Sequence, residues 1–516
     1  MHRSFQIKEI RSEIVSHIDH EASLAALAQT SQLFQDPALN ILWRKQDTLY
    51  HLARCFPSDL VIEEVSPDTG GLSQRMRLLR PIVATDWERP LFYSRRVRHF
   101  DFQGPDYPVD PSDWIFSVLS LSLPGDYVFP NLESLDWFSE DSSSFPFICL
   151  FLGPSVTSLS VTYPDLPSYL SLLSALSRKH ASLTAVTLTV DWENDVDGRY
   201  ISLFANNLTR IETLAVPGLD WSALQHLSGL ATLRSLRLDK FIAPISCPLF
   251  SSTAFSALES INIGETDASS ATRLIAVMSS APLRCLYISF ATCISTARMS
   301  VLYRAIAANI SRTTLTQFRQ QSAVKILTEA EQRTCMIDNN AMRSLCCFPN
   351  LVGVAITSPA GFELDDDTLA DLACAWPRLE SLSLTPGLVR PGTAEPRVTL
   401  AALHHLAKHC SQLRMLRLPF DATVVPAAAP VSGEQARHVA LRYLHIEHCP
   451  IEASLPVSRF LSGIFPNVSV DIVRCSGRKR WMEVREQLLH FVAAREEERA
   501  WARHRSVVGE IIVDRF

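Results

Sequence analysis

The sequence predicts an α/β fold in which one strand-forming unit is repeated many times behind a small helical module. The first observation is an apolar pattern, L-x-x-L-x-L, of which one copy is Leu379-Glu-Ser-Leu382-Ser-Leu384. The second is its spacing, because successive copies begin 22 to 36 residues apart. The third is the length of 516 residues, which is too long for one compact core. Together these observations indicate a stacked array.

The pattern has a direct structural meaning. The last two apolar residues of each copy are two positions apart, so they point to one side of a strand. A single strand cannot bury that side alone, whereas neighbouring copies stacked in parallel bury it continuously. A period of this size is typical of leucine-rich repeats. We therefore predict a horseshoe-shaped solenoid of about 12 to 14 parallel strands, with the strands on its concave face.

The copies are distributed along most of the chain. Complete copies begin at Val97, Leu132, Val156, Leu183, Ile211, Leu233, Leu258, Leu283, Leu351, Leu379, Leu413 and Leu441, and partial copies begin at Leu315 and Phe465. The copy at Leu315 carries Gln320 where the third apolar residue is expected, and the spacings on its two sides, 32 and 36 residues, are long. We expect this copy to be the weakest point of the array.

Three short amphipathic helices are expected in the first fifty residues. The apolar stripe of the first helix is Ile7, Ile10, Ile14 and Ile18, spaced by three or four residues. The second helix is expected at residues 21–29 and the third at residues 32–44. A cluster of this size is marginally stable by itself, so we expect it to lean on a partner.

This segment also resembles a known family. The stretches 9–18, 24–28 and 38–44, together with Phe34, are similar to the F-box of fungal proteins, and residues 92–97 resemble the segment that leads into the first repeat of that family. The resemblance extends from about residue 5 to residue 475. It implies a substrate-recognition adaptor of a Skp, cullin and F-box ubiquitin ligase. In such an adaptor the F-box docks the Skp-type linker subunit, and through it a cullin, while the repeats hold a protein substrate.

The expected contacts with the Skp-type subunit are apolar residues of this module. A module of this size has too few inward positions to bury all of them. They are Ile7, Ile10, Leu24, Leu39 and Trp43. One alternative is that the three helices only shield the first strand as a terminal cap. Packing of Trp43 on the Val97 strand would favour this alternative. Another is a leucine-rich-repeat scaffold that binds a protein without any ligase attached.

The domain boundaries follow from these patterns. We place the helical module at residues 1–56, a turn-rich linker at residues 57–90 and the solenoid at residues 91–475. Residues 476–516 are expected to form a capping helix and a tail. The apolar stripe of that helix, which includes Trp481, Val484 and Leu488, is expected to cover the open end of the solenoid.

No catalytic, phosphate-binding or dinucleotide motif occurs, so we expect neither enzymatic activity nor a cofactor. Residues 191–198 are acidic but lack the glycine and the glutamate that a calcium loop needs at its sixth and twelfth positions. His405 and His409 are four residues apart on an expected helix, without a third metal ligand beside them. Residues 365–367 are three aspartates before another helix, where acids stabilise the N-terminus.

Composition restricts the setting of the protein. The net charge of −6 argues against a nucleic-acid partner, and the 12 cysteines contain no C-x-x-C pair, which indicates a reducing compartment. The first residues carry charges where a signal peptide would be apolar. The uncharged run at residues 142–164 fits a loop and a buried strand better than a membrane span. We expect a cytoplasmic or nuclear protein, or one found in both places, without a membrane partner.

The substrate is expected on the concave face, towards the C-terminal half. There the residue between the two strand leucines of each copy points away from the apolar spine. Most of these residues are small. The larger hydrogen-bonding side chains on or beside this column are Arg237, Tyr287, Arg417, Tyr443 and His445. Tyr and Arg are frequent at binding hot spots, although an ordinary polar sheet face would look the same in sequence.

Overall fold

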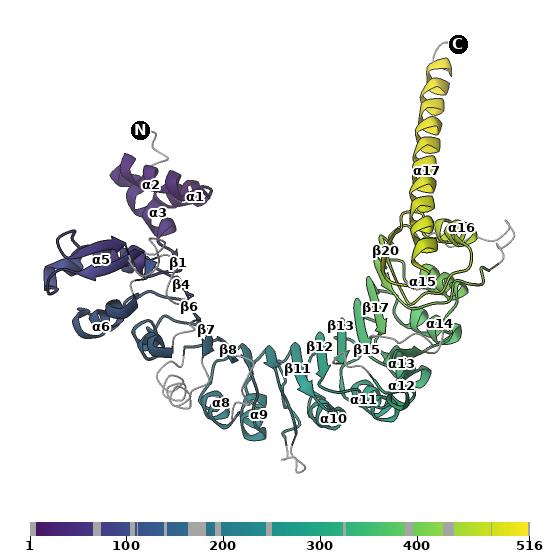
Figure 1. Ribbon diagram of the computed structural model, residues 1–516, viewed down its shortest axis with the longest axis horizontal. Coiled ribbons are helices and arrows are strands. Elements are labelled where there is room, and N and C mark those ends of the chain that lie inside the picture. The colour runs from purple at the N-terminus through teal and green to yellow at the C-terminus, as the bar shows by residue number, and fades with distance from the viewer. Residues whose placement is uncertain are drawn as a thin grey trace. The chain divides into compact units, whose positions relative to one another are not determined.

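A computed structural model describes residues 7–65, 74–103, 109–110, 112–138, 142–163, 182–190, 198–243, 250–322, 327–386, 396–426, 438–475 and 477–513. The chain divides into two compact units, Met1–Leu238 and Asp239–Phe516. In each unit, parallel strands lie side by side and helices cover one face of the sheet (Figure 1).

The first unit begins with the three expected helices, α1 (Lys8–Ser16), α2 (Glu21–Thr30) and α3 (Gln32–Leu42). They enclose a core of Val15, Leu24 and Ala38. The side chain of Ser31 accepts a hydrogen bond from the backbone N–H of Leu33, which caps α3 and separates it from α2. Each helix is therefore short because a capping or turn residue interrupts the apolar pattern.

The segment after α3 has more structure than the expected linker. The strand β1 (Lys45–Gln46) pairs in parallel with β4 (His99–Phe102), so the sheet begins within the range assigned to the helical module. A two-residue strand carries no recognisable repeat pattern, which is why the sequence did not predict it. Residues 57–90 contain an antiparallel hairpin, and the helix α5 (Glu88–Ser94) begins within them. The remaining short elements here are α4 (Tyr50–Ala53), β2 (Val61–Val65), β3 (Gln74–Leu78) and the 3₁₀ helix η3 (Ala84–Trp87).

An ion-pair cluster fixes this segment. The guanidinium of Arg80 donates to both carboxylate oxygens of Asp86, at 2.8 and 2.9 Å, and to Asp59 at 2.9 Å. The hydrogen bond from Arg80 lowers the pKa of Asp86 to about 2. Asp59 precedes β2 and Asp86 follows β3, so the cluster connects the chain on the two sides of this strand pair.

The repeat strands of the first unit continue from β4 in register. They are β6 (Ser134–Phe138), β7 (Ser158–Tyr163), β8 (Ala185–Val190), β9 (Thr213–Val216) and β10 (Ser235–Leu238). The chain between them forms β5 (Val109–Asp110), α6 (Ser112–Ser122), the 3₁₀ helix η4 (Ser142–Leu150), α8 (Gly198–Ala205) and α9 (Trp221–Ser228). The acidic residues 191–197 lie outside the described part of the chain.

The second unit repeats the same arrangement. Its strands are β11 (Ser260–Thr266), β12 (Cys285–Phe290), β13 (Gln317–Ser322), β15 (Gly353–Ser358), β17 (Ser381–Pro386), β18 (Met415–Arg417), β19 (Tyr443–Glu447) and β20 (Ser469–Arg474). Its helices and short pairs are α10 (Ala268–Ala276), α11 (Thr296–Asn309), α12 (Glu329–Thr334), β14 (Ile337–Asp338), α13 (Asn339–Arg343), η5 (Ser344–Cys347), β16 (Phe362–Glu363), α14 (Asp366–Ala375), η6 (Leu400–Ala402), α15 (Leu403–His409) and α16 (Ser454–Ile464). Asp365 caps α14 by accepting a hydrogen bond from the Thr368 N–H at 2.8 Å, so the expected cap is confirmed.

Each apolar anchor of the sequence is followed by one strand, and the spine residues are buried. In β17, for example, Leu382 and Leu384 are both fully buried, while Ser381 and Ser383 on the other side are only partly covered. Within the described residues the parallel sheet has 15 strands, one more than the upper limit of 14 predicted. The additional strand is β1, which was not predicted because it lacks the apolar pattern. The predicted repeat array is confirmed within each unit.

The copy with Gln320 is not a defect of the array. β13 pairs in register with β12 and with β15, and Gln320 is buried with its amide fully used. Its Oε1 accepts a hydrogen bond from the buried Tyr303 hydroxyl on α11 at 2.6 Å. Its Nε2 donates to the Ser322 hydroxyl at 3.2 Å. A buried polar group whose partners are present costs little, so the structure accommodates this copy; that it is the weakest point of the array stays a prediction.

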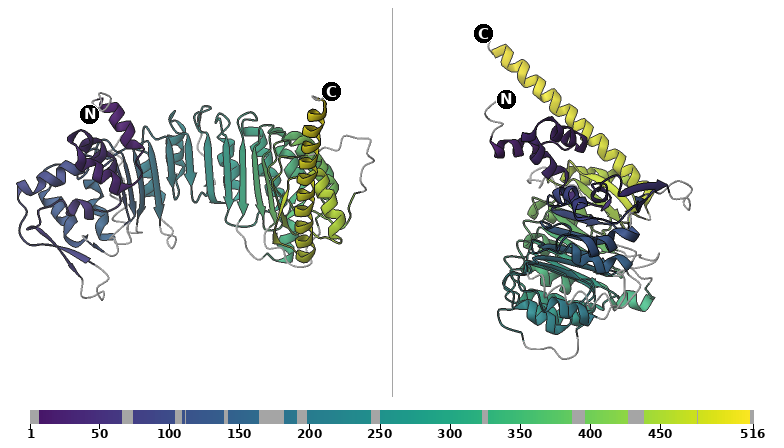
Figure 2. Two further views of the ribbon diagram at one scale, coloured as in Figure 1. Left: turned by 90° about the horizontal axis from the view of Figure 1, so that it is seen from above. Right: turned by 90° about the vertical axis from the view of Figure 1, so that its left-hand side faces the viewer.

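The last helix, α17 (Arg478–Val513), covers the end of the second unit. Trp481 and Val484 are fully buried, and the Trp481 indole N–H donates to the Cys449 carbonyl at 2.8 Å. The helix is longer than the expected cap, and its C-terminal half extends away from α16 and β20 (Figure 2). Across the described residues, no helix combines the length and the hydropathy that a bilayer span requires.

We predict that Tyr303 and Gln320 stabilise the fold as a pair. Tyr303→Phe and Gln320→Leu should each lower the free energy of unfolding by about 1–3 kcal/mol, because each leaves a buried polar partner unsatisfied. The double variant should lose clearly less than the sum of the two. Urea denaturation of the four proteins measures this coupling, and Arg319→Leu, at an exposed position on the same strand, serves as the control. A more stable Gln320→Leu variant would show that the amide is a defect after all.

Candidate functional site

The first candidate surface is an apolar stripe on α1. Ile7, at the N-cap, is 49% exposed, and Ile10 and Ile14 on the helix are 37% and 41% exposed. Val15 is the α1 residue that enters the core of the cluster. The module therefore buries one side of α1 and leaves three isoleucines on the surface. Exposed apolar residues grouped in this way are typical of binding surfaces.

Leu24 and Leu39 do not belong to that surface. Leu24 is 3% exposed in the core of the helical cluster, and Leu39 is 8% exposed on α3. The expectation that both would be exposed is wrong, because the three helices pack more completely than their short length indicates. Whether the exposed members of the predicted set bind a partner remains a prediction.

Trp43 ties the helical module to the first repeats. Its indole stacks on the ring of Tyr93 in α5, with centroids 4.6 Å apart. Close by, Arg96 forms an ion pair with Asp36 on α3 at 2.6 Å and a hydrogen bond to Asn40. The alternative in which the helices shield the first strand expected Trp43 to pack on the Val97 strand, whereas the indole stacks on Tyr93 of α5; the pairing of β1 with β4 is what attaches the module to the first strand. The exposed stripe on α1 does not match this alternative.

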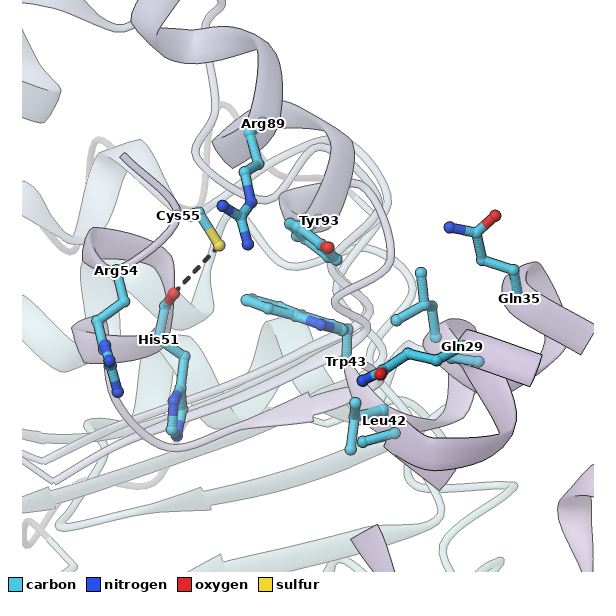
Figure 3. A pocket seen from close by; sticks show the side chains of 12 residues that line it. Gln29, Gln35, Leu42, Trp43, His51, Arg54, Cys55, Arg89 and Tyr93 are labelled. Atoms are coloured by element: carbon cyan, nitrogen blue, oxygen red, sulfur yellow. Dashed lines mark hydrogen bonds between the residues drawn. The ribbon is translucent and has the colours of Figure 1, made fainter. Parts of the chain in front are cut away.

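A pocket opens beside Trp43 (Figure 3). It has a volume of about 430 Å³, and its walls come from α2 and α3 on one side and from α4 and α5 on the other. The lining residues are Ala25, Ala28, Gln29, Gln35, Leu39, Leu42, Trp43, His51, Arg54, Cys55, Arg89 and Tyr93. Trp43 and Leu39 were predicted from the sequence as contact residues, but the pocket was not, because Arg89 and Tyr93 in its wall lie 46 or more residues after Trp43.

A cysteine and a histidine line this pocket, yet they do not form a nucleophile pair. The Cys55 thiol donates to the backbone carbonyl of His51, with 3.3 Å between sulfur and oxygen. Burial raises the pKa of Cys55 to about 11, so the thiol stays protonated at neutral pH. An activated cysteine needs a lowered pKa and an adjacent base. The pocket is therefore suited to binding and not to covalent catalysis.

The second candidate surface is the strand face of β18, β19 and β20, on the side opposite the helices. Tyr443 is 58% exposed there. His445 lies beside Arg417 in register, and its Nδ1 is 3.0 Å from a carboxylate oxygen of Asp471. Three of the predicted residues thus lie on neighbouring strands, and two of them, Arg417 and His445, have acidic partners that were not predicted from the sequence.

Arg417 is engaged within the protein. Its guanidinium bonds to one carboxylate oxygen of Glu447, from Nε at 3.0 Å and from Nη2 at 2.8 Å. The Glu447 side chain is 3% exposed, and Arg417 is its ion-pair partner within the protein. A shift of register between Ile446 and Glu447 accompanies the inward position of this carboxylate. Sequence alone shows an acid two residues after His445 but not that it turns inward.

The other two predicted residues lie elsewhere. Arg237 is exposed on β10 in the first unit. Tyr287 is on β12 in the second unit, where its hydroxyl donates to Gln321 on β13 at 2.8 Å.

We predict that Arg417 is primarily a stabilising residue. Arg417→Ala should lower the free energy of unfolding by about 2–4 kcal/mol, somewhat less than for a fully buried pair because the arginine is 28% exposed. Tyr443→Ala, at an exposed position, should change it by about 0.5 kcal/mol or less. Urea denaturation compares the two variants. Equal stability of the two would show that Glu447 does not depend on Arg417.

Comparison with known proteins adds few relatives. No protein-family model matches the sequence, and no curated protein matches it. Similar solved structures include the leucine-rich repeat-containing protein LegL7 from Legionella pneumophila, with 13% identity, 57% of this chain and 95% of that chain covered, and a TM-score of 0.30. A TLR13–ssRNA13 complex has 12% identity, 74% and 56% coverage and a TM-score of 0.29.

The Toll–Spätzle complex of Drosophila has 12% identity, 78% and 57% coverage and a TM-score of 0.33. This chain thus spans little more than half the length of the last two proteins. The type of fold is assigned by this chain's own strands, which repeat with the leucine-rich-repeat period and pair in parallel register within each unit.

Proposed function

We propose that this protein is a binding scaffold without enzymatic activity of its own, and that it serves as the substrate-recognition adaptor of a Skp, cullin and F-box ubiquitin ligase. The observation that carries the proposal is the stripe of Ile7, Ile10 and Ile14 on α1. The helical cluster already has a core, so these residues are left for a partner. Such an adaptor accelerates ubiquitin transfer only by bringing the substrate close to a charged enzyme.

The substrate is proposed to bind the strand face of β18 to β20. Tyr443 offers a large exposed aromatic side chain, and the neighbouring His445 and Asp471 offer a hydrogen-bonding pair. An aromatic anchor surrounded by polar groups is typical of protein-binding surfaces. Arg417 supports this surface from within, because it is held by Glu447.

A scaffold without a ligase is the second candidate. It is favoured by the stacking of Trp43 on Tyr93 and by the pairing of β1 with β4, which attach the helices to the array as a terminal cap would be attached. The two candidates differ in the role of the α1 stripe, which a cap does not need.

We predict that Ile10→Asp/Ile14→Asp abolishes capture of a Skp-type subunit. Interface anchors contribute roughly 2 kcal/mol or more each, so affinity should fall by about 30-fold for each of the two residues. Trp43 is left intact because it is part of the packing. A pull-down with purified Skp-type subunit measures the effect, and Leu203→Asp, at a leucine on α8 that is 53% exposed, is the matched control. Equal capture by the α1 variant, folded by circular dichroism, would favour the scaffold alone.

We predict that Tyr443→Ala weakens substrate binding without affecting the Skp-type partner. Proximity labelling in cells should lose a defined group of proteins by about 30-fold, the effect of removing one hot-spot side chain. Val301→Ala, at an exposed position on α11, is the control. An unchanged set of labelled proteins, with normal capture of the Skp-type subunit, would place the substrate on another surface.

A further inference from the structure

The pocket beside Trp43 has a one-sided charge. Two arginines, Arg54 and Arg89, and one histidine, His51, are among its lining residues, and no aspartate or glutamate is. Two glutamines, Gln29 and Gln35, add further hydrogen-bonding groups. In a protein with an overall charge of −6, a pocket whose charged lining residues are both arginines favours an anionic ligand.

Arg89 is available to such a ligand. Three carboxylates of this part of the chain bind other arginines, because Asp59 and Asp86 bind Arg80 and Asp36 binds Arg96. Within the described residues, Arg89 has no recorded ion pair or hydrogen bond. Figure 3 shows its guanidinium directed toward the indole of Trp43. A guanidinium presents several N–H donors in a plane, which suits a carboxylate, sulfonate or phosphate group.

The same pocket has a flat apolar surface. The Trp43 indole is held nearly parallel to the Tyr93 ring, at an interplanar angle of 24°. Leu39 and Leu42, from the same helix end, complete the apolar part of the lining. A ring on the ligand would stack or pack against these side chains at little entropic cost, because the aromatic rings are already in place.

The walls are fixed before any ligand binds. The ion pair of Arg96 with Asp36 connects the segment after α5 to α3, and parallel pairing of β1 with β4 holds the chain that follows Trp43. Leu39, which lines the pocket, is itself largely buried. Its volume of about 430 Å³ lies within the range of small-molecule sites.

We propose that this pocket binds a small organic anion in which a carboxylate, sulfonate or phosphate is joined to a flat apolar ring. The anionic group bonds to Arg89, with Arg54 and His51 at the same pocket, and the ring packs on Trp43 and the leucines. This site is separate from the α1 stripe and from the strand face, so it does not rest on the proposed ligase function.

Naphthalene-2-sulfonate is a suitable probe, and neutral naphthalene-2-methanol is its matched control. Titration of the full chain by calorimetry should show that the sulfonate binds at least about tenfold more tightly than the alcohol. Arg89→Gln should weaken the sulfonate by about tenfold, the effect of losing a charge-assisted hydrogen bond, and should leave the alcohol unchanged. Arg95→Gln, an exposed arginine of the same segment outside the pocket lining, should bind like the wild type.

Two further variants test the ring surface. Trp43→Phe should retain binding of the sulfonate, whereas Trp43→Leu should weaken it by several-fold. Because Trp43 also packs on Tyr93, each variant is first compared with the wild type by thermal unfolding. Arg89 is exposed and its exchange does not endanger the fold, so the arginine comparison stands even if a Trp43 variant is unstable.

Three results would overturn the proposal. One is the absence of sulfonate binding, and another is equal binding of the sulfonate and the alcohol. The third is binding of an acidic peptide, acetyl-Glu-Phe-Glu-amide, through Arg89 without any binding of the sulfonate, which would make the pocket a peptide site. None of these results bears on capture of the Skp-type subunit, which depends on Ile10 and Ile14.

Discussion

Burial of the apolar spine between neighbouring parallel strands is the interaction on which the rest of this structure depends. No single repeat can remove its two strand leucines from water, and each strand buries them only by pairing in register with the next. Gln320, which pairs with Ile288 of the neighbouring strand, shows that an amide can replace an apolar residue in the spine. It does so only where Tyr303 and Ser322 provide the hydrogen bonds that water would otherwise provide.

The same constraint decides which side chains remain for binding. On the strand face, positions between the spine residues point away from the core, and large polar groups there bond first to each other. Arg417 is held by Glu447 and Tyr287 bonds to Gln321, so these side chains stabilise the face as well as shape it. Tyr443 is different, because no neighbouring strand covers it. On a repeat protein, a large exposed side chain that no neighbouring side chain binds therefore indicates a binding surface better than residue type does.

The helical module meets two demands at once. Through Trp43 and β1 it continues into the first repeats, and this junction creates the cation-lined pocket. Through the isoleucines of α1 it offers an apolar surface that the junction does not use. A terminal cap and a docking module are thus compatible in one segment, because α1 and α3 present different faces. The Cys55 thiol in the junction is inert, since burial keeps it protonated.

Sequence by itself determined the repeat array, because spacing and alternation are local properties: the 14 anchors, from Val97 to Phe465, each precede a strand. It also located the three helices and the cap at Asp365. Tertiary structure decided the rest. It buried Leu24 and Leu39, turned Glu447 inward to Arg417, and brought Arg89 to Trp43. These outcomes depend on contacts between segments that are distant in sequence. A periodic pattern does not show which residues will form such contacts.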